Sequence, residues 1–112
     1  MDEGAPHGGG RELAGFQRRY LRGLANPLRP VVHVGAAGVT ENVLAATDRA
    51  LADHELVKVR LHDPEDKHAM ADALAAGAHA QLAGVIGHTV ILYRRHPEHP
   101  RIRLPERERG SR

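Results

Sequence analysis

Residues 31–42 (VVHVGAAGVTEN) join a short apolar run, two glycines and a helix start. The β-branched run Val31–Val34 predicts a strand. Thr40 is placed to cap a helix whose first turn contains Glu41. The loop between them has the pattern GxxG and consists of Gly35, Ala36, Ala37 and Gly38. Its glycines permit a tight turn and the close approach of another chain, and the N–H groups of the following helix favour a phosphate there.

Alternating helix and strand patterns extend outward from this loop. The expected elements are helix 13–25, strand 31–34, helix 40–54, strand 56–61, helix 65–76 ended by Gly77 as C-cap, strand 80–86, a Gly87-His88 hairpin turn and strand 89–93. Right-handed crossovers would make the first three strands parallel and leave the fourth antiparallel at one end of the sheet. We therefore predict an α/β (α+β) fold, ordered α-β-α-β-α-β-β, with a four-stranded mixed sheet packed with helices.

The chain has 112 residues, enough for one domain. We expect the domain at 13–94, after a disordered N-terminal tail (1–12) and before a basic, flexible C-terminal tail (95–112). There is no cysteine, which excludes disulfides and thiolate metal sites. No apolar run is long enough to span a membrane and no signal pattern opens the chain. We expect a cytoplasmic monomer.

Charge is distributed unevenly along the chain. The formal net charge is +2 overall, with +2 for residues 1–40, −4 for 41–72 and +4 for 73–112. Basic ends around an acidic middle suggest a face for a polyanion. A solvated surface with a basic tail explains the same pattern.

The basic candidates fall in three groups. In the first helix Leu13, Phe16, Tyr20 and Leu24 form an apolar stripe, opposite Arg18, Arg19 and Arg22, with Arg29 just beyond the helix. If this arginine face adjoins the loop, guanidinium groups could hold phosphates bidentately; otherwise it is a solvated helix face.

The second group is Lys58 and Arg60, on one face of strand 56–61, where the alternative is an edge strand protected by charge. The third is Arg94, which with Arg95 either extends the basic surface or begins the tail.

The sequence does not indicate a catalytic site or a metal site. The chain has nine histidines, but they are scattered over loops, helix ends and the tail, without a cysteine or a helical HxxxH pair. No nucleophile–base spacing stands out. We expect no enzyme activity, no cofactor and no metal.

The GxxG loop itself has more than one interpretation. It could be a strand-to-helix turn that uses glycine only for backbone freedom, or a backbone clamp on single-stranded nucleic acid, as in KH-type modules. A dinucleotide fold is less favoured because Ala37 stands where GxGxxG needs a glycine. A Walker A loop is excluded, since no Gly-Lys-Ser/Thr follows.

Four collinear blocks strengthen the nucleic-acid interpretation. Residues 21–25 (LRGLA), 30–43 (PVVHVGAAGVTENV), 54–60 (HELVKVR) and 85–94 (VIGHTVILYR) resemble the CRM domain family, specifically its stand-alone bacterial YhbY-type proteins. The resemblance implies an RNA-binding domain, similar in fold to the C-terminal domain of bacterial translation initiation factor three. It also implies ribosomal RNA in precursors of the large ribosomal subunit as the partner, held by the GxxG loop and neighbouring basic residues.

Two departures from the family pattern matter. Family members commonly carry lysine where this chain has Ala36, so its loop offers backbone N–H groups and no cation. Relatives also tend to have a polar residue at the position of Gly84. With few aromatic residues, base stacking should contribute little and RNA shape should dominate. The competing hypothesis is a protein-interaction module that docks a ribosomal protein or assembly factor.

Overall fold

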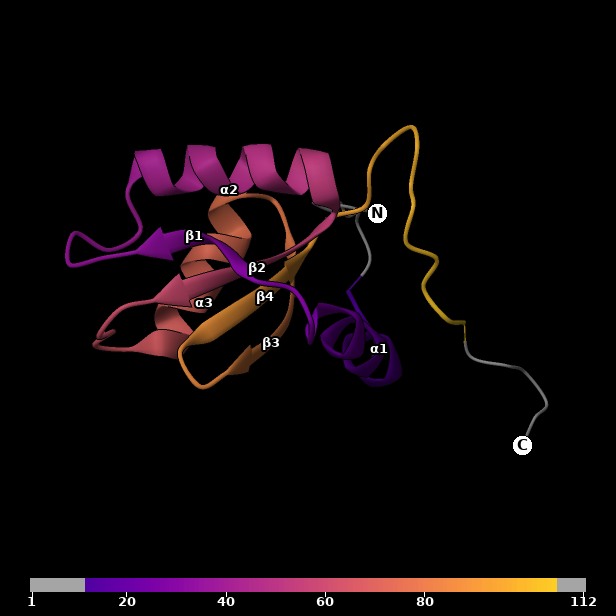
Figure 1. The fold of residues 1–112 in the computed structure, drawn as a ribbon, viewed down its shortest axis with the longest axis horizontal. Coiled ribbons are helices and arrows are strands. Elements are labelled where there is room, and N and C mark those ends of the chain that lie inside the picture. The colour runs from indigo at the N-terminus through magenta and orange to yellow at the C-terminus, as the bar shows by residue number, and fades with distance from the viewer. Residues whose placement is uncertain (1–11, 107–112) are drawn as a thin grey trace, which may run out of the picture.

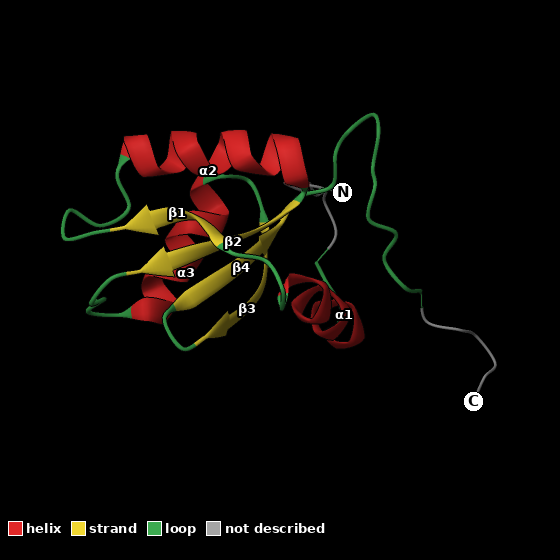
Figure 2. Cartoon of the chain, viewed as in Figure 1, coloured by secondary structure: helices red, strands yellow, loops and turns green. Residues whose placement is uncertain are grey.

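A computed structural model describes residues 12–106. The predicted N-terminal tail, apart from Glu12, lies outside these residues. The elements are α1 (Gly15–Ala25), β1 (Pro30–Val34), α2 (Glu41–His54), β2 (Leu56–Leu61), α3 (Lys67–Gly77), β3 (Gln81–Ile86) and β4 (Thr89–Tyr93). Their order confirms the predicted α-β-α-β-α-β-β fold with a mixed four-stranded sheet (Figures 1 and 2).

The strands lie in the order β1-β2-β4-β3. β1 pairs with β2 in parallel, and β4 is antiparallel to both of its neighbours, so the first three strands share one direction as predicted. The predicted place of β4 at one end of the sheet is wrong, because it lies between β2 and β3. The uninterrupted apolar run Val90–Tyr93 suits an interior strand, and all four residues are buried.

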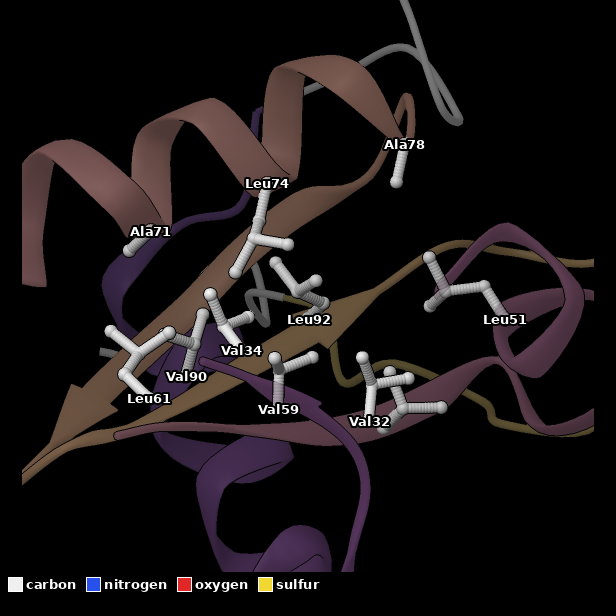
Figure 3. Close-up of a cluster of buried hydrophobic side chains, with 11 residues drawn as sticks. Val32, Val34, Leu51, Val59, Leu61, Ala71, Leu74, Ala78, Val90 and Leu92 are labelled. Carbon is white, nitrogen blue, oxygen red and sulfur yellow. The ribbon is translucent and has the colours of Figure 1, made fainter. Parts of the chain in front are cut away.

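One face of the sheet carries the larger core, under α2 and α3 (Figure 3). Alternate residues of the strands, such as Val34, Val59 and Leu92, point into it. Leu51 of α2 and Leu74 of α3 meet them there, each almost fully buried. This packing holds α2, and with it the loop that precedes α2, in a fixed position on the sheet.

α1 packs on the opposite face, over only part of the sheet. Leu21 and Ala25 are fully buried against a cluster that includes Ile91 and Tyr93. The predicted apolar stripe is correct for Leu13, which is buried in this cluster, but wrong for Tyr20 and Leu24, which are 41% and 39% exposed. The side of α1 that packs on the sheet is instead the one that carries Leu21 and Ala25, whose aliphatic side chains fit closely against it.

Gly77 does not cap α3. The helix continues through Gly77, and the left-handed residue after it is His79, with φ of 54°. A Cβ on Gly77 would lie 2.6 Å from Cδ2 of Leu44 in α2. The glycine thus permits close contact between the two helices.

We expect Gly77→Leu to lower the free energy of unfolding by about 1–3 kcal/mol through overpacking. The control is Gly23→Leu in α1, where a Cβ meets nothing within 4 Å, and which should gain up to about 1 kcal/mol of helix propensity. Urea unfolding of both variants, of Leu44→Ala, and of Gly77→Leu combined with Leu44→Ala measures the coupling between positions 77 and 44. Equal stability of the two leucine variants would contradict the close-contact explanation.

The C-terminal segment, expected as a flexible tail, makes defined contacts as far as Pro105, whose carbonyl accepts from Gln17 Nε2 at 3.1 Å. Residues 107–112 of the predicted tail lie outside the described residues. The backbone N–H groups of His96, Arg101 and Ile102 donate to the carboxylate of Glu55, at 2.8, 2.9 and 2.9 Å. Ile102 and Leu104 pack against the buried cluster under α1. The chain after β4 is therefore held by the junction between α2 and β2.

Glu55 is only 1% exposed and has a left-handed backbone, with φ of 64°. Burial acts to raise the pKa of its carboxyl, but the three backbone N–H donors and the charge of Arg101 outweigh burial and hold the pKa below its usual 4.5. Glu55 is thus an ionised, fully hydrogen-bonded anchor for the C-terminal segment.

Candidate nucleic-acid interface

The GxxG loop forms a tight exposed turn at the carboxyl end of β1. The N–H of Gly38 donates to the carbonyl of Gly35 at 3.0 Å. Gly38 has a φ of 79°, a conformation that residues with a Cβ adopt only with strain. The second glycine is therefore required by the turn itself.

Gly35 is different. Its φ is not positive, and a Cβ built on it would meet nothing within 4 Å. Within the described residues, neither backbone conformation nor packing requires a glycine here. A side chain at position 35 would therefore extend into the open space outside the loop.

The start of α2 matches its prediction. Thr40 Oγ1 accepts from the N–H of Val43 at 3.2 Å, which makes Thr40 the N-cap. The N–H groups of the first turn face the loop side and lack partners within the helix. Glu41 in the same turn is exposed, and its carboxylate weakens the positive potential that the helix end offers an anion.

Two other loops share this end of the sheet with the GxxG loop (Figure 2). The N–H of His62, just after β2, donates to the carbonyl of Val34 at 2.9 Å. In the β3–β4 hairpin, the carbonyl of His88 accepts from the N–H of Leu61 at 2.8 Å. These bonds tie the three loops into one edge.

The arginines of α1 do not adjoin the loop. The helix lies toward the other end of the sheet (Figure 1). Arg22 lies along the sheet, where its Nη1 donates to the carbonyl of Ala83 at 3.1 Å and its Cδ occupies the space above Gly84. The expectation that Arg22 sits opposite the packed face of the helix is therefore wrong. Gly84 leaves room for this arginine, since a Cβ there would lie 2.6 Å from Arg22 Cδ.

The other arginines near α1 reach solvent. Arg18 is exposed, although its Nη1 is hydrogen-bonded to the carbonyl of Leu13. Arg19 and Arg29 are exposed, and no hydrogen bond or ion pair to another residue of 12–106 is found for either side chain. All three lie away from the GxxG loop, on α1 or in the segment between α1 and the start of β1.

Lys58 and Arg60 lie on the same face of β2 but have different surroundings. Lys58 Nζ donates to the carbonyls of Asn26 and Leu28, at 3.2 and 3.1 Å, and so ties the end of α1 to the sheet. Arg60 is exposed. The alternative of a charge-protected edge strand is wrong, because β2 lies between β1 and β4.

Arg94 has a set of partners inside the domain. Its Nη1 is 2.8 Å from Oδ1 of Asp48 in α2 and 2.7 Å from the carbonyl of Ala78. Its Nη2 donates to the backbone carbonyl of Asp48. The guanidinium therefore joins β4 to α2 and to the end of α3.

The sequence interpretation missed one pair of side chains at the loop end. His33 of β1 and His62 lie with their Nδ1 and Nε2 atoms 2.8 Å apart and their ring centroids 5.1 Å apart. Both are exposed. Alternation in β1 and the parallel pairing of β1 with β2 could have indicated this proximity.

Among residues 12–106, no three histidine, aspartate or glutamate side chains are grouped so that they could hold a metal ion. None of the helices in this part of the chain has the length and apolar character needed to cross a membrane.

Comparison with known proteins identifies the family. The profile of the CRS1/YhbY (CRM) domain matches residues 13–94. The chain belongs to the CRM domain family. The loop, the three helices and the four strands described above all lie within the CRM domain, whereas the C-terminal segment held by Glu55 follows it.

Several members of the family are similar over most of their length. The Bacillus subtilis protein named "Probable RNA-binding protein YqeI" is 40% identical over 95 residues, which are 83% of this chain and 99% of the relative. An "RNA-binding protein" of Haemophilus influenzae is 41% identical over 97 residues, 85% of this chain and 97% of the relative. The solution structure of SAV1595 from Staphylococcus aureus matches with a TM-score of 0.74 and 36% identity, covering 83% of this chain and 99% of the other.

Proposed function

We propose that this protein binds RNA without catalysing a reaction, and that its RNA is ribosomal RNA in pre-large-subunit particles during ribosome assembly. Relatives that match nearly end to end are named as RNA-binding proteins. The family resemblance supplies the link to the large subunit. The proposal assigns the binding to the exposed GxxG loop and to arginines on the α1 side of the sheet.

The observation that carries this proposal is the open space at Gly35. A glycine that the fold does not need supports close approach of an external backbone to the loop. Ala36 brings no cation, so the loop would contribute N–H groups and shape. Neutralisation of phosphates would come from Arg60 and, for a longer RNA, from Arg18, Arg19 and Arg29. Lys58, Arg22 and Arg94 already have partners inside the domain and are minor contributors in this proposal.

Salt-titrated binding to a ribosomal RNA fragment tests the proposal. Fluorescence anisotropy should give an affinity that falls linearly with salt on logarithmic axes. With a fragment long enough to reach α1, we expect Arg19→Ala to reduce the slope by about one unit, as loss of one phosphate contact does. The matched control is Arg49→Ala, an exposed arginine of α2, which should keep the native slope. No binding at low salt would contradict RNA binding.

Sedimentation tests the ribosomal part separately. The tagged protein should migrate with large-subunit precursors in a sucrose gradient, and crosslinking should map its contacts to ribosomal RNA. If the protein binds RNA but does not migrate with large-subunit precursors, the ribosomal part of the proposal is wrong and its RNA target is a different one.

An apolar groove favours the protein-docking alternative. It has a volume of about 440 Å³ and is lined by residues that include Leu24, Leu28 and Val31, of which Val31 is 50% exposed. If a ribosomal protein occupies it, co-purification should survive nuclease treatment and be lost on Leu28→Glu. Loss of all partners on nuclease treatment would favour RNA.

A further inference from the structure

A row of four side chains crosses the sheet at its loop end. The strand registers pair His33 with Arg60, Arg60 with Thr89, and Thr89 with Ile86. All four lie on the face that α1 covers elsewhere, because they alternate with the residues of the larger core. His33 and Arg60 are exposed, and Ile86 is 57% exposed. We call this set the loop-end row.

α1 stops short of the loop-end row. The next row along the sheet includes Lys58, Ile91 and Gly84. There Ile91 is 1% exposed, Lys58 is bonded to the end of α1, and Arg22 lies over Gly84. The sheet is therefore covered up to this second row and open from the loop-end row to the GxxG loop.

The loop-end row begins in a fixed pair of rings. His62 continues the β2 strand direction through its N–H bond to Val34, which brings it beside His33 on the same face. The two rings are stacked, with an interplanar angle of 26°, and share one hydrogen bond. Within the described part of the chain, His33 Nε2 and His62 Nδ1 have no hydrogen-bond partner. Both residues of the pair are exposed, so its free ring nitrogens and the ring faces that are not stacked on each other are accessible to solvent.

Arg60, beside this pair, determines which kind of ligand the row fits. No hydrogen bond or ion pair to another of residues 12–106 is found for its guanidinium, and none of the other three members of the row is acidic. An exposed cation between rings and a hydroxyl is a poor match for an apolar protein segment. It suits an anionic ligand that also has flat faces.

We propose that the loop-end row is a base-binding platform for unpaired nucleotides of an RNA strand held by the GxxG loop. Bases stack on imidazole rings and guanidinium planes as they do on aromatic residues, so stacking contributes here despite the expectation drawn from the few aromatic residues, and Thr89 offers a hydroxyl to a base edge. β1 connects the two parts directly, because Gly35 follows Val34 and His33 is only two residues away. The platform rests on the proposed RNA binding and adds that the preferred RNA is single-stranded at this point.

The test uses the full chain and two probes, a single-stranded oligoribonucleotide containing 2-aminopurine and an RNA hairpin of equal length. Stacking should quench the fluorescence of the single-stranded probe on binding. We expect His33→Ala to weaken binding of this probe about tenfold, with an unchanged salt slope and unchanged affinity for the hairpin. His33→Phe, which keeps a ring, should retain most of the native affinity.

The outcomes separate the platform from the proposal on which it rests. If neither RNA binds the native protein, RNA binding itself fails. If the native protein binds both RNAs but His33→Ala binds the single strand as tightly as the native protein, only the platform is overturned. It is also overturned if His33→Ala and Ile86→Ser keep RNA affinity but lose a nuclease-resistant protein partner. Imidazole NMR signals of the native protein, which should shift with the single strand and not with the hairpin, avoid reliance on any variant's folding.

Discussion

Gly35→Asp is expected to lower the affinity for RNA at least about tenfold while the protein keeps its native melting temperature. A carboxylate about 4 Å from a phosphate is repelled by about 4 kcal/mol at an effective dielectric constant of 20, and a loss of 1.4 kcal/mol is tenfold in affinity. The free protein should tolerate the change, because position 35 is exposed and has room for a side chain. Anisotropy titrations and thermal melts measure the two effects.

Two controls separate charge from position. Ala73→Asp places the same charge at an exposed site on α3 and should leave the affinity near native. Gly35→Ala adds a methyl without charge, so a loss of affinity there indicates close approach of the RNA backbone. If Gly35→Asp and Ala73→Asp bind RNA alike, the loop is not part of the interface.

Gly38 is unsuited to the same experiment. With φ of 79°, most residues other than glycine would store about 1–2 kcal/mol of strain there, so that lost binding and lost folding would mix. Asparagine tolerates this conformation better than most residues. Gly38→Asn is therefore the variant that keeps the turn while adding a side chain.

Glu55→Ala is expected to lower the free energy of unfolding by about 3 kcal/mol. It removes three hydrogen bonds to a buried carboxylate, each worth about 1.5–3 kcal/mol when the acceptor is charged, although water reaching the released segment offsets part of the loss. For a domain of this size the melting temperature should fall by more than about 10 °C. Glu98→Ala, in the same C-terminal segment but exposed, is the control and should change stability little.

Acid titration gives an independent check on Glu55. Its pKa is lowered on folding, so its contribution to stability is complete above about pH 4.5 and is lost as the pH falls through the lowered value. Glu55→Gln cannot ionise and should flatten this part of the stability profile. An unchanged profile between the native protein and Glu55→Gln would contradict the ionised anchor.

Local sequence rules predicted most of the fold. The alternation of side chains correctly predicted β2 at Leu56–Leu61, and the N-cap residue Thr40 correctly predicted the start of α2. Both signals depend only on residues close in the sequence. The position of β4 was missed because strand order depends on which strand is most completely buried. Gly77 was misassigned for a similar reason, since its contact with Leu44 is set by tertiary packing.

The candidate site was harder to predict than the fold. A list of basic residues does not distinguish an exposed side chain such as Arg60 from Lys58 or Arg94, which have partners inside the domain. The placement of the GxxG loop followed from its flanking elements. Its separation from the α1 arginines did not, because nothing local fixes the end of the sheet at which α1 packs.

The contacts of Glu55 with the C-terminal segment determine where the domain can be truncated or fused to another sequence. If the polypeptide ended at Arg94, the buried carboxylate of Glu55 would lose its hydrogen-bond donors, which are the N–H groups of residues 96, 101 and 102. The smallest autonomous unit thus reaches past the last strand, to Ile102 and Leu104, which pack against the cluster under α1, and to Pro105, whose carbonyl is bonded to α1. A flexible linker to a second domain would have to begin beyond Pro105, which lies beside α1 because Gln17 Nε2 donates to its carbonyl at 3.1 Å.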